Sequence, residues 1–80
     1  MRIAGIEALR FSVLTKNQCF NFVSCNRSAE FEKGRPVLRI QRKDGSYAIA
    51  RDSDWIVKEQ DGSFDVYTED GFEKFVRKRA

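Results

Sequence analysis

The sequence predicts a single α+β domain, built on a twisted and mainly antiparallel sheet of about five strands. The first observation is length, because 80 residues form one domain with a thin hydrophobic core. The second is a pair of alternating apolar runs around each of two Asp-Gly turns. The third is helical spacing of apolar residues in two other segments. The expected order over residues 1–80 is β-α-β-β-β-β-α, with one helix after the first strand and a short C-terminal helix.

Residues 2–11 carry a pattern that periodicity alone does not settle. Ile3, Ile6, Leu9 and Val13 recur at helical spacing, whereas the strand-like alternation is broken. From periodicity, the segment is interpreted as a helix by a narrow margin.

A short helix is predicted over residues 16–25, with Thr15 as its N-cap and Asn26 as its C-terminal stop. One face would carry its apolar side chains into the core: Cys19, Phe20, Phe22 and Val23. Residues 28–35 are predicted to form a polar loop in which Phe31 is the one buried candidate.

Residues 38–41 and 47–50 are predicted to form a β-hairpin around Asp44-Gly45. Asp-Gly favours a two-residue type I′ turn, which would place Ile40 opposite Ile49. The expected core face of this hairpin consists of Leu38, Ile40, Tyr47 and Ile49.

Residues 55–58 and 64–67 are predicted to form a second hairpin around Asp61-Gly62. The same turn type would place Lys58 opposite Asp65 as an ion pair. The expected apolar face, with the only tryptophan in the core, consists of Trp55, Val57, Phe64 and Val66.

Residues 69–79 are predicted to form a helix capped by Thr68. Acidic residues in its first turn and basic ones in its last suit the helix dipole: Glu69, Asp70, Lys74, Arg77, Lys78 and Arg79. An apolar stripe should dock on the sheet: Phe72, Phe75 and Val76.

The amino-acid composition provides few of the side chains that catalysis commonly uses. Histidine is absent, which removes the commonest zinc sites and the usual nucleophile–base pairs. Cys19 and Cys25 are expected to be reduced and structural. The chain is therefore predicted not to be an enzyme, and neither a metal nor a cofactor is expected. Acidic side chains that fall in pairs are interpreted as turn residues: Asp52 with Asp54, and Asp61 with Asp65.

The net charge of +3 hides a segregation along the chain. Residues 1–51 carry ten basic and four acidic side chains, residues 52–73 one basic and eight acidic, and residues 74–80 four basic and none acidic. Such segregation can steer a charged partner. One candidate binding surface, the basic face, consists of Arg35, Arg39, Gln41, Arg42, Lys43 and Arg51. The other, the acidic arm, consists of Asp52, Asp54, Asp61, Asp65, Glu69 and Asp70.

Five short motifs resemble those of a family of small proteins encoded by tailed phages. Members of that family have an "IEAIQF"-like strand, a helix, a strand ending in an "EG" turn, a "GDWI" box, an "NGE" turn and a closing "F…Y" segment. The matching residues are Ile6-Glu7-Ala8-Leu9-Arg10-Phe11, Asp44-Gly45, Ser53-Asp54-Trp55-Ile56-Val57, Asp61-Gly62-Ser63 and Phe72-Glu73-Lys74-Phe75.

The resemblance implies a strand, not a helix, at residues 2–11, and a phage or prophage origin. It implies no chemistry, because members of that family are mostly uncharacterised. Ser53 stands where the box usually has glycine, and Phe75 where the closing aromatic is usually tyrosine. The run over residues 16–20 is also similar to a stretch of an anti-CRISPR protein, but five residues transfer no role.

These observations lead to a hypothesis of a non-catalytic inhibitor that occupies a charged surface on a host defence complex, in the manner of an anti-CRISPR protein. The partner would be a host protein or nucleoprotein complex, and a homodimer would supplement the thin core. One alternative is a nucleic-acid-binding module that uses the basic first hairpin, although Tyr47 is expected on the core face. Another is an oligomeric sponge for a small nucleotide signal. No apolar run reaches the roughly 20 residues of a membrane span, so a cytoplasmic protein of the host cell is expected, without a membrane partner.

Overall fold

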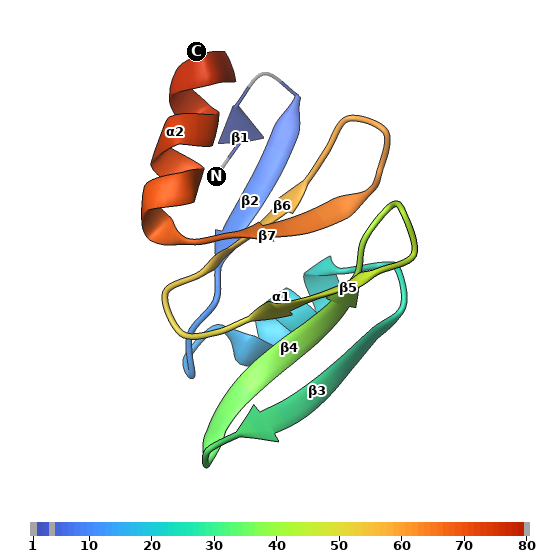
Figure 1. Cartoon of the computed structure of the whole chain (residues 1–80), viewed down its shortest axis with the longest axis vertical. Helices are drawn as coiled ribbons and strands as arrows, with labels where there is room; N and C mark the ends of the chain where they lie inside the picture. Colours follow the sequence, from blue (N-terminus) through green and yellow to red (C-terminus); the bar gives the residue numbers. More distant parts are fainter. Residues whose placement is uncertain (1, 4, 80) are drawn as a thin grey trace.

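The computed structural model describes residues 2–3 and 5–79, and the side chains of Ile3 and Arg79 lie outside what it describes. Arg79 as a basic side chain of the last helix, and Ile3 in the helical spacing, therefore remain predictions. The structure is a compact α+β domain, which confirms the predicted class (Figure 1). Its elements are β1 (Arg2–Ile3), β2 (Ile6–Arg10), α1 (Lys16–Phe22), β3 (Arg27–Glu32), β4 (Arg35–Gln41), β5 (Tyr47–Ala50), β6 (Trp55–Lys58), β7 (Phe64–Tyr67) and α2 (Glu69–Arg79).

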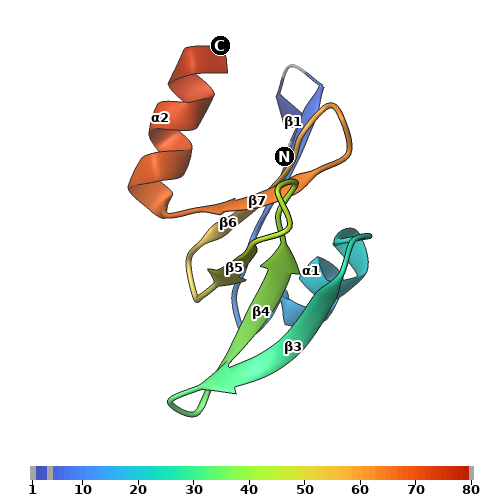
Figure 2. The ribbon, with the colours of Figure 1, turned by 45° about the vertical axis from the view of Figure 1, so that its right-hand side comes forward.

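The strands form two antiparallel sheets rather than the single sheet that was predicted. Sheet A has the order β1-β2-β6-β7, and sheet B has the order β3-β4-β5. Figures 1 and 2 place α2 at one end of the molecule and sheet B at the other, with sheet A between them. The strand β3 was not predicted, and the single strand predicted over residues 2–11 is two strands, β1 and β2, which pair with each other.

Sheet A packs on both of its faces. One face meets α1 and sheet B in the main core, whose buried residues are Phe11, Cys19, Val23, Leu38, Ile40, Ala50, Ile56 and Phe64. The other face meets α2 in the α2 core, whose buried residues are Ile6, Ala8, Val57 and Phe72. Half-buried Trp55 packs against this second cluster, stacked on Phe72 with 4.2 Å between ring centroids. The tryptophan therefore belongs to the core, as predicted.

The strand β2 shows that the helical interpretation of residues 2–11 is wrong. Ile6 and Ala8 pack into the α2 core, whereas Leu9 and Phe11 pack into the main core. A strand with apolar residues on both faces has no clear alternation, which is why periodicity failed. The strand implied by the resemblance is confirmed over Ile6–Arg10.

The helix α1 is shorter than predicted. It ends at Phe22, and Val23 has extended backbone angles, with φ −81° and ψ 118°. Asn26 is not the helix stop, because its carbonyl oxygen accepts a hydrogen bond from the Gln41 amide at 2.9 Å as the chain enters β3. Thr15 stands at the N-cap position without a side-chain capping bond, since its hydroxyl donates instead to the Arg10 carbonyl oxygen at 2.7 Å.

The prediction of a polar loop over residues 28–35 is wrong. Most of this segment belongs to β3, which pairs with β4 around Lys33-Gly34. Both turn residues have positive φ, 52° and 78°, as a two-residue type I′ turn requires. Phe31 is 73% exposed, so the prediction that it is buried is also wrong. The sequence of β3 resembles that of a loop because β3 is an edge strand in which most residues are polar.

The Asp-Gly turns lie where they were predicted, but they have a different geometry. Gly45 has φ 89°, whereas Asp44 does not have the positive φ that a type I′ turn requires. The Gly45 amide donates to the Arg42 carbonyl oxygen at 3.0 Å, and the Arg42 amide donates to the Ser46 carbonyl oxygen at 2.7 Å. This pattern fits a three-residue loop with a left-handed glycine, not a two-residue type I′ turn.

The longer loop moves the register of the first hairpin by one residue. Ile40 pairs with Ala48, not with Ile49. A shift of one residue sends every side chain of a strand to the other face. Ala48 and Ala50 are therefore buried, whereas Tyr47 is 43% exposed. The predicted core position of Tyr47 is wrong.

The second hairpin has the same turn and the same shift. Gly62 has φ 87°, and its amide donates to the Glu59 carbonyl oxygen at 2.9 Å. Lys58 consequently pairs with Phe64, so its predicted pairing with Asp65 is wrong. The prediction of a single apolar face is also wrong. Trp55 and Val57 pack in the α2 core, whereas Phe64 and Val66 pack in the main core.

The C-terminal helix follows its prediction. The Thr68 hydroxyl accepts a hydrogen bond from the Gly71 amide at 3.2 Å, an N-cap interaction. Phe72 is buried in the α2 core, and Phe75 and Val76 pack against it.

Ser53 supplies the tight turn before Trp55 at a conformational cost. Its φ is 75°, in a region that costs a residue with a side chain about 1–2 kcal/mol. Glycine avoids that cost but loses more chain entropy on folding, by about 0.5–1 kcal/mol. We therefore expect Ser53→Gly to raise the free energy of unfolding by about 0.5–1 kcal/mol, as measured by urea titration. Ser24→Gly, at an exposed position with ordinary φ, should bring no gain, and a loss of stability in Ser53→Gly would contradict this account.

Candidate functional site

The outer face of sheet B is the side turned away from α1, and α1 lies behind the sheet in Figure 1. The register of the three strands brings side chains together in rows across it. It consists of Ser28, Glu30, Val37, Arg39, Gln41, Tyr47 and Ile49.

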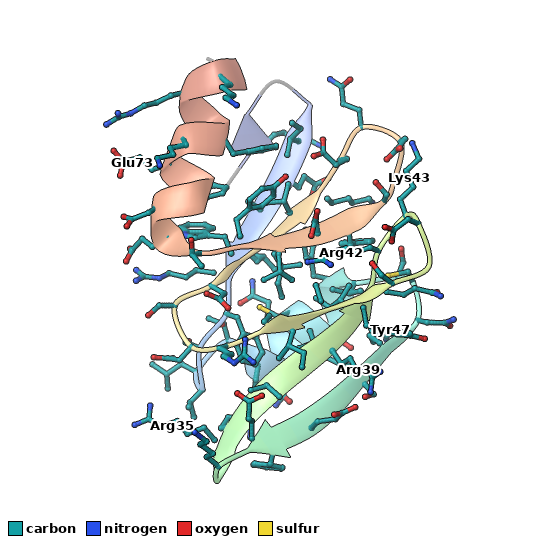
Figure 3. All side chains as sticks on the ribbon, viewed as in Figure 1. Arg35, Arg39, Arg42, Lys43, Tyr47 and Glu73 are labelled. Carbon is teal, nitrogen blue, oxygen red and sulfur yellow. The ribbon has the colours of Figure 1, made fainter. Side chains whose placement is uncertain are left out.

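A contact between an arginine and an aromatic ring lies on this outer face. The guanidinium carbon of Arg39 lies 4.6 Å from the ring centroid of Tyr47, within the range of a cation–π interaction. Arg39 Nη1 also lies 4.0 Å from Glu30 Oε2, and Ser28 donates its hydroxyl hydrogen bond to that oxygen. Figure 3 shows Arg39 and Tyr47 side by side on the sheet. A hollow of about 420 Å³ beside them is lined by Asn26, Arg27, Ser28, Glu30, Arg39 and Tyr47.

Two members of the basic face point instead toward sheet A. Arg42 Nε donates to Asp65 Oδ1 at 2.9 Å, and Lys43 Nζ donates to Asp61 Oδ2 at 2.6 Å. Figure 3 shows both cations beside the hairpin of β6 and β7. The basic face and the acidic arm therefore meet and partly neutralise each other. The hollow between the two hairpins, of about 760 Å³, is lined by Arg42, Lys43, Asp44, Glu59, Gln60, Asp61, Ser63, Phe64 and Asp65.

The remaining basic-face residues lie apart from one another. Arg51 Nε lies 2.6 Å from Glu32 Oε1, and Gln41 accepts a hydrogen bond from the Asn26 side chain at 3.0 Å. Arg35 is exposed at the far end of sheet B (Figure 3).

The acidic arm is also divided. Glu69 pairs with Arg10 at 3.0 Å, and Asp54 accepts a hydrogen bond from the Arg51 amide at 2.9 Å. Asp52 and Asp70 are exposed. The sequence therefore identified charged residues correctly but not their grouping, and it missed Glu30 and Glu32 as partners of the arginines.

The ion pair between the hairpins shifts the protonation of its members. Hydrogen bonds from Lys43 and Ser63 hold the pKa of Asp61 well below its usual range, and the same carboxylate raises the pKa of Lys43. A carboxyl group whose pKa is lower in the folded chain stabilises the fold above its unfolded pKa of about 3.9. That contribution is lost as the pH falls through the lower, folded pKa.

We expect Lys43→Met to raise the pKa of Asp61 toward its usual range, because the first cause of the shift is removed. Carbon-detected NMR titration of the carboxyl groups would measure this change. Lys33→Met, a replacement at an exposed turn residue, should leave the pKa of Asp61 unchanged. An unchanged pKa in Lys43→Met would show that Ser63 alone maintains the shift.

Among residues 2–3 and 5–79, no group of three or more His, Cys, Asp or Glu side chains could hold a metal ion. Cys19 and Cys25 are free thiols, and burial raises the pKa of Cys19, which disfavours the nucleophilic thiolate. Within the described part of the chain, no helix is long and apolar enough to cross a membrane.

Comparison with protein-family models, curated proteins and solved structures gives no match for this chain.

Proposed function

We propose that this chain is a non-catalytic binding protein that inhibits a host defence complex by occupying a charged protein surface, as an anti-CRISPR protein does. The observation that carries the proposal is the cation–π pair of Arg39 and Tyr47 on the outer face of sheet B. Arginine and tyrosine are enriched among the residues that dominate binding energy at protein interfaces. The phage origin and the defence target rest on the resemblance of the sequence motifs.

The geometry supports a binding surface that is already ordered before the partner arrives. Arg39 is held between the Tyr47 ring and the Glu30 carboxylate, and Ser28 fixes that carboxylate in turn. Side chains held in this way lose less entropy on binding. The mixture of charges on this face suits a protein surface that carries both signs.

A nucleic-acid partner is the second candidate, favoured by the exposure of Tyr47. An aromatic ring beside an arginine can stack on a base. However, phosphate binding needs unpaired cations, and four members of the basic face already lie beside carboxylates. They are Arg39, Arg42, Lys43 and Arg51. The ion pairs therefore favour a protein partner.

A pull-down from host lysate tests the proposal, with and without nuclease treatment. We expect a stoichiometric protein partner that survives nuclease and is lost with the double replacement Arg39→Ala and Tyr47→Ala. Removal of interface residues that dominate binding typically costs 2 kcal/mol or more, about thirtyfold in Kd. Arg77→Ala on α2, which also removes an ion-paired and exposed arginine, is the matched control and should retain the partner.

Two outcomes would contradict the proposal. Partners that vanish with nuclease would establish nucleic-acid binding instead. A partner that survives the double replacement but is lost with Arg77→Ala would move the contact surface from sheet B to α2.

A further inference from the structure

The strand β3 forms an open edge of sheet B. The sheet has the order β3-β4-β5, and no described strand lies beyond β3 in Figures 1 and 2. The strand pairs with β4 over all six of its residues without a break, and it contains no proline. An unbroken edge of this kind is a template for pairing with another strand.

The hydrogen-bonding pattern identifies the backbone groups that point outward. The Asn26 carbonyl oxygen accepts a hydrogen bond from the Gln41 amide at 2.9 Å, so residues at even positions of β3 point their backbone groups toward β4. Pro36, which has no amide hydrogen, stands opposite Phe31, as this alternation requires. Arg27, Ala29 and Phe31 therefore point their N–H and C=O groups away from β4.

The outward-pointing residues include an exposed aromatic side chain. Phe31 is 73% exposed, and Ala29 beside it is also exposed. Both line a mainly apolar hollow of about 310 Å³ between α1 and the hairpin of β3 and β4. Apolar area on an unpaired edge favours association.

We propose that β3 pairs antiparallel with β3 of a second copy of this chain, about a two-fold axis at Ala29. The charges and the length of the strand together select this register. An axis at Ser28 would pair only residues 27–29 of each β3, against residues 27–31 for an axis at Ala29. An axis at Glu30 would place that carboxylate opposite its own copy. An axis at Arg27 would place the Arg27 side chains of the two copies opposite each other. An axis at Phe31 would oppose Glu30 to Glu32 twice, and like charges directly opposite are destabilising.

With the axis at Ala29, no two side chains of like charge lie opposite each other. This register places Ser28 opposite Glu30 and Phe31 opposite Arg27, whose guanidinium carbon lies 4.1 Å from the ring centroid of Phe20. The Phe31 ring of one copy would make a second cation–π contact with Arg27 of the other copy, and it would be shielded from solvent. Because a two-fold interface uses each contact twice, both exposed phenylalanines would be buried.

This pairing would join two copies of sheet B into one continuous sheet. The outer faces would then form a single surface with two pairs of Arg39 and Tyr47. The inference of a dimer rests on the geometry of β3 alone and does not depend on the identity of any host partner.

Sedimentation velocity over a dilution series tests the dimer. We expect the wild-type chain to reach twice its mass of 9.3 kDa and to dissociate on dilution. Ala29→Arg would place two like charges at the axis and should leave only monomer. Leu14→Arg adds the same charge at a side chain that is 96% exposed and lies outside β3, so it should retain the dimer. Circular dichroism would confirm that both variants fold.

A disulfide cross-link tests the register directly. Residues at a hydrogen-bonded antiparallel pair have Cα atoms about 5.5 Å apart, within reach of a disulfide. Ala29→Cys in a Cys25→Ser background should therefore cross-link on mild oxidation, whereas Leu14→Cys in that background should not. A wild-type chain that stays monomeric throughout, or a dimer that persists in Ala29→Arg, would overturn the proposal.

Discussion

Replacement of Phe64 by alanine is expected to lower the free energy of unfolding by about 3–5 kcal/mol. The Phe64 side chain is 2% exposed, and its ring meets that of Phe22 edge to face at a centroid distance of 5.6 Å. It belongs to the main core, where sheet A packs against α1 and sheet B. A small domain has a total stability near the lower end of about 5–15 kcal/mol, so the variant should be largely unfolded at moderate temperature.

Phe31→Ala is the matched control for this prediction. The same atoms are removed from a side chain that is 73% exposed, so the stability should change by no more than about 0.5 kcal/mol. Urea unfolding followed by circular dichroism would measure both variants, at a protein concentration that keeps the chain monomeric. Equal losses in the two variants would contradict the separation of a buried Phe64 from an exposed Phe31.

The two turns show which part of the fold could be predicted from the sequence. Asp-Gly located both hairpins, because glycine at a positive φ is a local requirement. The turn type depends on the serine that follows. The Asp44 carboxylate accepts hydrogen bonds from the Ser46 amide and hydroxyl, and Asp61 and Ser63 repeat this arrangement. One extra residue in each loop was enough to exchange the faces and expose Tyr47.

The candidate site was harder to predict because its contacts join distant parts of the chain. Arg42 and Asp65 carry opposite charges, but nothing local indicates that two hairpins in different sheets bring them within 2.9 Å. The pairing of Glu32 with Arg51 requires the strand β3, whose polar sequence is typical of a loop. By contrast, the cap and the apolar stripe of α2 are local patterns, and both were predicted correctly.

Replacement of Phe72 by alanine is expected to release α2 from sheet A. Phe72 is the buried residue that α2 contributes to the α2 core, and its ring stacks on Trp55 at 10° between the ring planes. Removing a buried phenylalanine costs about 3–5 kcal/mol. The partly buried Phe75 and Val76 are then the apolar contacts that remain for a helix of 11 residues, a length that is marginal in isolation. The fluorescence of Trp55, the only tryptophan, should shift to longer wavelength as its ring becomes exposed to water.

Hydrogen exchange would separate this local release from unfolding of the whole domain. The two cores lie on opposite faces of sheet A and share no buried residue. We therefore expect the amides of α2 to lose protection in Phe72→Ala while those of β4 retain theirs. Lys74→Ala, at an exposed position of the same helix, should change neither. A parallel loss of protection in α2 and β4 would mean that the two cores unfold as one cooperative unit, and the outer face of sheet B would then depend on α2.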